Sequence, residues 1–262
     1  MYSVNYNRIV IKIGTTSLTH KNGKINLQRI EEICRIISDL KKLGKEIILV
    51  TSAAIAAGMD HLNIAERPRD IVGKQVASAV GQVILMQIYQ KFFSLYGFCI
   101  GQVLLTNDVI DDDLRKQNAK NTFNELIKLG IIPIVNANDA IAIDELDEKI
   151  SDNDKLSAYV SFITDSDLLV IFSDIEGLYD ADPNVNSHAK IIPKVSEISE
   201  EIKKLATGSV NKLGTGGMVT KLQAATICMN NNINLVIAKG NMPSLLLDIV
   251  NGKNVGTLFS KY

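Results

Sequence analysis

The stretch KLGTGGMVTKLQAA, residues 212–225, has the composition of a phosphate-binding segment. Its three glycines let the backbone approach a ligand closely, and their N–H groups can take up charge on phosphate oxygens. A helical pattern follows and carries Lys221 one turn in. The spacing is not that of the Walker motif, in which Gly-Lys-Ser/Thr closes the loop. A glycine-rich loop before a helix is common, so the segment indicates phosphate chemistry only in combination with other charged residues.

Lys12 is the first such residue, because it stands inside the apolar run Val10–Gly14. A charge in a central strand is costly unless it has a partner. The alternative is an edge-strand lysine that reaches solvent. The glycine and hydroxyl residues that follow at once favour a lysine directed at phosphate oxygens beyond the end of the strand.

Asp152-Asn153-Asp154 places two carboxylates at the start of a predicted helix. One aspartate is expected as an ordinary N-cap. The second exceeds that need, and it could orient a lysine or gather a metal through water. The segment Thr51–Gly58 is small and carries two hydroxyls, which suits either an approaching anion or close helix packing by alanines. The acidic segment Asp174–Pro183 alone is typical of a solvated turn.

The bulk composition excludes several classes of function. The 262-residue chain has a net charge of -1, which argues against a nucleic-acid partner. Its three cysteines are scattered without metal-ligand spacing. The N-terminus lacks a signal-peptide pattern, and we expect no apolar run long enough to cross a bilayer. These features predict a cytoplasmic protein with no membrane partner.

Short apolar runs alternate with longer helical patterns along the chain, which predicts an α/β protein with a mostly parallel sheet. The predicted strands are residues 8–13, 47–51, 100–105, 131–136, 168–173 and 235–238, and the clearest helices are 27–43, 71–96 and 114–129. We expect one domain, residues 1–262, with a soft subdivision near residue 165. Small or polar residues follow four of the strands, where open α/β sheets bind their ligands. They are Gly14–Ser17, Thr51–Ala54, Asn136–Asp139 and Ser173–Asp174.

Taken together, these segments resemble the amino acid kinase family. The matching pieces run in the family's order over nearly the whole chain: IVIKIGTTSLT, ILVTSAAIAAGMDHL, KQVASAVGQ, GQVLLTNDV, IIPIVNANDA, SDNDKLSA, SDIEGLYDADP, GTGGMVTKLQAA and VGTLFS. The resemblance implies a three-layer αβα sandwich, with a lobe of about residues 1–165 that binds an amino acid and a lobe of about 166–262 that binds the nucleotide. It is most specific for the branch that uses ATP and Mg²⁺ to phosphorylate the γ-carboxylate of L-glutamate, the first step of proline biosynthesis. It also implies a homodimer or homotetramer, and a short form without the C-terminal PUA domain that many members carry.

The resemblance also implies roles for individual residues. Lys12, Lys221 and Asp154 match catalytic positions, Asp154 being the carboxylate that orients the lysines. The substrate-binding positions are Ser52, Asn136, Asp139 and Asn153. The nucleotide-binding positions are Lys12, Ser173, Asp174, Thr215, Gly216, Gly217, Met218, Val219, Thr220 and Lys221. No protein metal site is implied, because Mg²⁺ is held mainly through the phosphates of ATP.

The chain departs from the family pattern at a few positions. Ala53, Ala137 and Ser151 stand where the family usually has Gly, Glu and Gly, and the loop Asp144–Lys149 is slightly longer. Two alternatives stay open. One is a family relative that acts on another acid, and the other is a non-catalytic sensor of glutamate or proline.

Overall fold

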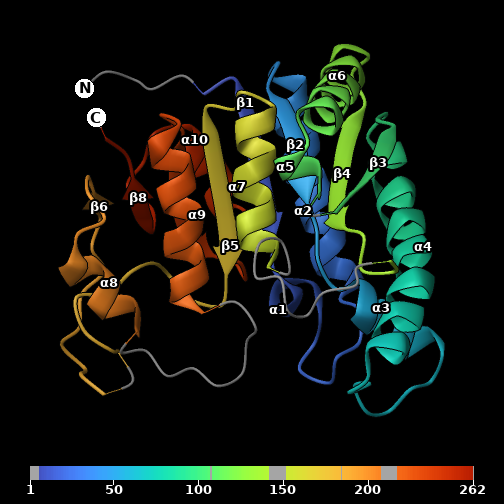
Figure 1. Cartoon of the computed structure of the whole chain (residues 1–262), viewed down its shortest axis with the longest axis horizontal. Coiled ribbons are helices and arrows are strands. Elements are labelled where there is room, and N and C mark those ends of the chain that lie inside the picture. The colour runs from blue at the N-terminus through green and yellow to red at the C-terminus, as the bar shows by residue number, and fades with distance from the viewer. Residues whose placement is uncertain (1–5, 107, 142–151, 184, 208–216, 262) are drawn as a thin grey trace.

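The computed structural model describes residues 6–106, 108–141, 152–183, 185–207 and 217–261. These residues form three layers, a central sheet with helices packed on both faces (Figure 1). The predicted αβα class is confirmed.

The sheet has eight strands in the order β3-β4-β2-β1-β5-β7-β8-β6. Among the described pairings of strands, only β7 with β8 is antiparallel. The strands are β1 Arg8–Ile13, β2 Glu46–Val50, β3 Ile100–Leu105, β4 Ile132–Ala137, β5 Leu168–Ser173, β6 Lys194–Val195, β7 Asn234–Lys239 and β8 Thr257–Phe259. β1 lies between β2 and β5, so the alternative of an edge-strand lysine at position 12 is wrong.

Helices cover the two faces of the sheet and bury separate apolar clusters. One face carries α2 Leu27–Lys42, α4 Ile71–Leu95 and α10 Leu245–Val250, and the other carries α6 Asp113–Lys128, α7 Asn153–Ile163 and α9 Met218–Asn230. The remaining helices are α1 Thr15–Leu18, α3 Ala54–His61, α5 Asp108–Asp111 and α8 Glu200–Thr207.

Local sequence signals predicted most of these elements. β1, β3 and β5 have the predicted bounds, and β2, β4 and β7 differ from them by one residue at each end. The Asn26 side chain caps α2 by accepting a hydrogen bond from the Arg29 N–H at 3.0 Å. Left-handed glycines follow the ends of α2, α4 and α6. β6 and β8 were missed because two or three residues are too few to give a periodic apolar pattern.

The expectation that no apolar run is long enough to cross a bilayer is wrong for helix α4. By length and composition alone, its 25 residues would suffice. In the fold α4 packs against α2 and α3. Its contact with α3 is made by glycines. A Cβ at Gly58 would lie 1.8 Å from the Ala77 carbonyl oxygen, and one at Gly81 would lie 1.7 Å from the Ala54 carbonyl oxygen. This close approach brings buried polar residues of α4 behind the carboxyl ends of the strands.

Candidate active site

A cavity of about 230 Å³ opens at the carboxyl ends of the central strands. This is where parallel sheets of this type bind ligands, because the loops after adjacent strands meet there. Eight of the residues singled out from the sequence line it: Lys12, Ser52, Asn136, Asp139, Asn153, Ser173, Asp174 and Lys221.

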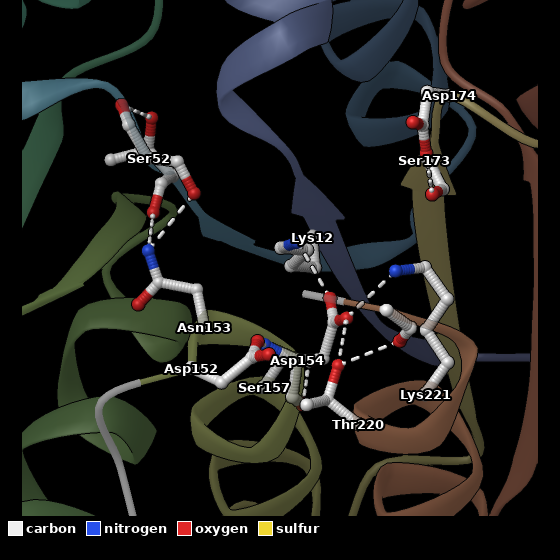
Figure 2. A network of polar contacts seen from close by, with 12 residues as sticks. Lys12, Ser52, Asp152, Asn153, Asp154, Ser157, Ser173, Asp174, Thr220 and Lys221 are labelled. Carbon is white, nitrogen blue, oxygen red and sulfur yellow. Dashed lines mark hydrogen bonds and ion pairs between the residues drawn. The ribbon is translucent and has the colours of Figure 1, made fainter. Parts of the chain in front are cut away.

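The centre of the site is a buried carboxylate between two lysines (Figure 2). Lys12 Nζ lies 2.6 Å from Asp154 Oδ1, and Lys221 Nζ lies 3.1 Å from Asp154 Oδ2. The Asp154 side chain is 0% exposed, and those of the lysines are 10% and 4% exposed. Residues from the first strand and from a helix near the C-terminus therefore converge on one carboxylate.

Two opposing effects act on the Asp154 carboxyl. Burial raises its pKa, but the ammonium groups of Lys12 and Lys221 outweigh burial and hold the pKa below its usual value. The Thr220 hydroxyl also donates to Asp154 Oδ2 at 3.3 Å. The carboxylate is therefore charged at neutral pH and can hold both lysines in place.

Asp152 has the role of an ordinary cap. It is the N-cap of α7, and its Oδ1 accepts from the Asp154 N–H at 2.7 Å. The two aspartates around Asn153 thus differ in their contacts. Asp152 caps the backbone of α7, and Asp154 pairs with the two lysines.

A group of amides and hydroxyls lies on one side of the lysines (Figure 2). Asn153 Nδ2 donates to Ser52 Oγ at 2.9 Å, to the Thr51 carbonyl oxygen at 3.0 Å and to Asn136 Oδ1 at 3.1 Å. Asn136 is 1% exposed. Three of the four predicted substrate residues, which come from three separate segments, are thus joined in one network.

Asp139 lines the same part of the cavity. Burial raises the pKa of its carboxyl, against the opposing effects of a 3.5 Å hydrogen bond from Ser78 and the charge of Arg67. Arg67 also lines the cavity, and it was not among the residues predicted from the sequence. Nothing in its local sequence distinguishes it from other surface arginines, so only the folded chain identifies it.

Ser173 and Asp174 lie on the opposite side of the lysines, at the end of β5 (Figure 2). The Ser173 hydroxyl donates to Asp174 Oδ1 at 2.9 Å. In the acidic segment that follows, Glu176 forms an ion pair with Lys239 at 2.9 Å. Ser173 and Asp174 therefore stand apart from Ser52 and Asn153, with the two lysines between them.

The glycine-rich segment is described from its last glycine onward. Gly217 is the exposed N-cap of α9, Met218 is buried and Val219 is exposed. Gly214, Thr215 and Gly216 lie outside the described residues, as do Ser151 and the loop Asp144–Lys149. Of the segment's residues, Lys221 is the one that lines the cavity in the part of the chain that the structure describes.

Ala53 has a left-handed backbone, with φ 72° and ψ 17°, directly before α3. This conformation favours glycine, because a Cβ there meets the following carbonyl oxygen. Ala53 is also buried at the cavity. The alanine-rich segment both packs on α4 and lines the site, so the two interpretations of residues 51–58 are compatible.

Comparison with known proteins shows the family to which the chain belongs. The profile of the amino acid kinase family matches residues 7–239. The chain belongs to the amino acid kinase family. Among members of this family, it is similar to glutamate 5-kinase of Clostridium perfringens, with 49% identity over 254 residues that cover 96% of this chain and 94% of that protein. It is also similar to glutamate 5-kinase of Caldanaerobacter subterraneus, with 46% identity over 96% of this chain and 67% of that protein.

Solved structures agree on the architecture of this amino acid kinase. UMP kinase from Bacillus anthracis superposes with a TM-score of 0.65 at 16% identity, over 98% of this chain and 96% of that one. UMP kinase from Ureaplasma parvum gives a TM-score of 0.66 at 17% identity, over 98% and 99%. At such low identity the likeness shows the fold alone.

Proposed function

We propose that this chain is a glutamate 5-kinase, which transfers the γ-phosphoryl group of ATP to the γ-carboxylate of L-glutamate. The products are ADP and γ-glutamyl 5-phosphate, and the reaction is the first step of proline biosynthesis. The observation that carries the proposal is the convergence of Lys12 and Lys221 on buried Asp154. The identity to glutamate 5-kinases over most of the chain gives the substrate.

The chemistry needs charge neutralisation more than proton transfer. A carboxylate is already a nucleophile at neutral pH, so no general base is required. The obstacle is repulsion between two anions, and phosphoryl transfer overcomes it mainly by positioning and electrostatics. Lys12 and Lys221 neutralise the non-bridging phosphate oxygens, and Asp154 keeps both ammonium groups at the cavity.

The two sides of the lysine pair take the two substrates in this proposal. Ser52, Asp139 and Asn153, within about residues 1–165, bind glutamate, and Asp139 faces its ammonium group. Ser173, Asp174 and the start of α9, within about residues 166–262, bind ATP. Thr215 and Gly216, the nucleotide positions that the family resemblance implies, belong to this second set.

Mg²⁺ enters as the partner of the ATP phosphates and adds positive charge where the phosphoryl group is transferred. In the described ranges, no group of three or more His, Cys, Asp or Glu side chains could hold a metal by itself. In this proposal the phosphates of ATP supply most of the ligands for the ion.

We also propose a cytoplasmic homodimer or homotetramer. Helix α4 exposes a row of apolar side chains that supports this assembly: Ile71, Val72, Val76 and Val83. Light scattering on the purified protein measures the mass, and a monomer would contradict this part of the proposal.

The decisive experiment is an ADP-release assay with glutamate, with and without Mg²⁺, in which hydroxylamine traps the acyl phosphate as γ-glutamyl hydroxamate. Aspartate, N-acetylglutamate and UMP serve as alternative acceptors. We expect ADP and hydroxamate in equal amounts with glutamate and Mg²⁺. Glutamate binding without ADP release would instead indicate a sensor, and turnover of another acceptor alone would indicate a different member of the family.

A further inference from the structure

We propose that Gln82 and Asn136 are positioning residues of the amino acid site, an inference that rests on the proposed function. They set which atoms of Asn153 and Ser52 face the substrate. Asn136 also lines the cavity, so its predicted contact with the substrate stays open to it. Gln82 lies on α4 and is not among the residues that line the cavity. It occurs in the motif KQVASAVGQ, none of whose residues is among the predicted site positions.

The orientation of the Asn153 amide follows from its partners. The Thr51 carbonyl oxygen can only accept a hydrogen bond, so the atom of Asn153 that lies 3.0 Å from it is the nitrogen. The amide oxygen then points away from Ser52 (Figure 2). Since Asn153 lines the cavity, this oxygen is an acceptor for the ammonium group of glutamate.

The same contact sets the hydroxyl of Ser52. Ser52 Oγ accepts from Asn153 Nδ2 at 2.9 Å, so its own hydrogen is directed to another acceptor. Ser52 lines the cavity and is 7% exposed. Its hydroxyl is therefore placed to donate to a carboxylate oxygen of the substrate, beside the acceptor that Asn153 provides.

Asn136 holds Asn153 in this orientation. Asn136 Oδ1 accepts from the Ala137 N–H at 3.0 Å and from Asn153 Nδ2 at 3.1 Å. A reversed Asn136 amide would put its nitrogen against both donors. The remaining Asn136 Nδ2 donates to Gln82 Oε1 at 3.0 Å, so both polar atoms of this buried side chain have a partner within the protein.

Gln82 completes the chain of contacts from behind the site. Its Oε1 is the partner of Asn136 Nδ2, and the close approach of Gly81 to Ala54 sets the depth of this part of α4. Gln82 Nε2 is buried and, within the described residues, has no hydrogen-bond partner. A buried donor without a partner is destabilising, so stability alone does not account for a glutamine here.

The test compares Gln82→Met, which removes the acceptor and keeps the length, with Gln82→Glu, which keeps an acceptor oxygen opposite Asn136. For Gln82→Met we expect KM for glutamate to rise about tenfold, with kcat and KM for ATP within about twofold of the parent, because one hydrogen bond that orients only the amino acid site is lost. Gln82→Glu is expected to restore KM for glutamate to within about threefold of the parent. Gln28→Met, at an exposed glutamine of α2, is the matched control.

A double-mutant cycle separates positioning from a structural role. If Gln82 acts through Asn153, Gln82→Met adds nothing further to KM for glutamate in an Asn153→Ala background. Additive effects would overturn the proposal, as would an unchanged KM in Gln82→Met or an equal rise of both KM values with a lower Tm. If Gln82→Met does not fold, a tenfold rise of KM in folded Gln82→Glu would overturn it. Absence of glutamate turnover in the parent protein would instead reject the proposed function.

Discussion

Replacing Asp154 by Asn removes the negative charge that pairs with both Lys12 and Lys221. The two ion pairs have N–O distances of 2.6 and 3.1 Å, and all three side chains are at least nine-tenths buried. At an effective dielectric constant of about 20, each attraction amounts to roughly 5–6 kcal/mol, which the desolvation of the charges largely offsets. The substitution takes from both buried ammonium groups their ion pair with this carboxylate. We therefore expect Asp154→Asn to lower the free energy of unfolding by about 3–5 kcal/mol.

Thermal unfolding measures this loss, and Tm should fall by at least about 6 °C for a chain of this size. ATP brings its own negative charge to the lysines, so saturating ATP should raise the Tm of Asp154→Asn more than that of the parent protein. Turnover should fall roughly a hundredfold, since the lysines are no longer held in one geometry. An unchanged Tm without ATP would refute the conclusion that Asp154 compensates both lysines.

Asp113→Asn is the matched control, because Asp113 pairs with Lys116 at 3.0 Å but its side chain is 98% exposed. Exposed pairs contribute little, so the change in stability should stay below about 1 kcal/mol. Acid titration gives a second test of Asp154. Its pKa is lowered in the folded protein, so its contribution is present above the unfolded-state pKa of about 3.9 and is lost as pH falls through the lower folded-state value. Asp154→Asn should lack this part of the acid-induced loss.

Three further outcomes are expected. Lys12→Ala and Lys221→Ala should each lower kcat at least a hundredfold, which corresponds to a rise of about 3 kcal/mol in the activation free energy. Circular dichroism should still show a folded protein. Near-normal turnover of either variant would contradict the role of that lysine. Asp139→Ala should raise KM for glutamate more than KM for ATP, and calorimetry with each ligand would reveal the reverse. Ala53→Gly should raise the free energy of unfolding by about 1 kcal/mol, because φ is 72° at this position; lower stability in urea titration would count against backbone strain there.

Local patterns in the sequence determined much of this protein. Apolar runs gave the positions of six strands, since both faces of the central strands are buried and each run is nearly continuous. The Asn26 cap and the left-handed glycines lie at the ends of the long helices, because such signals act within a single turn. The polar residues that follow the strands were predicted to share one edge of the sheet, and eight of the predicted site residues line one cavity.

The tertiary structure alone decided which of these residues touch. Lys221 and Asp154 are 67 positions apart, and Asn136 and Gln82 are 54 apart. Such pairs depend on the order of strands in the sheet and on the close approach of α3 to α4, which no local periodicity encodes. The left-handed backbone of Ala53 likewise depends on the tertiary structure, because alanine by itself disfavours this conformation. Residue types and spacing thus identified the charged residues of the site. Only the packing of distant segments determined that two lysines share one carboxylate.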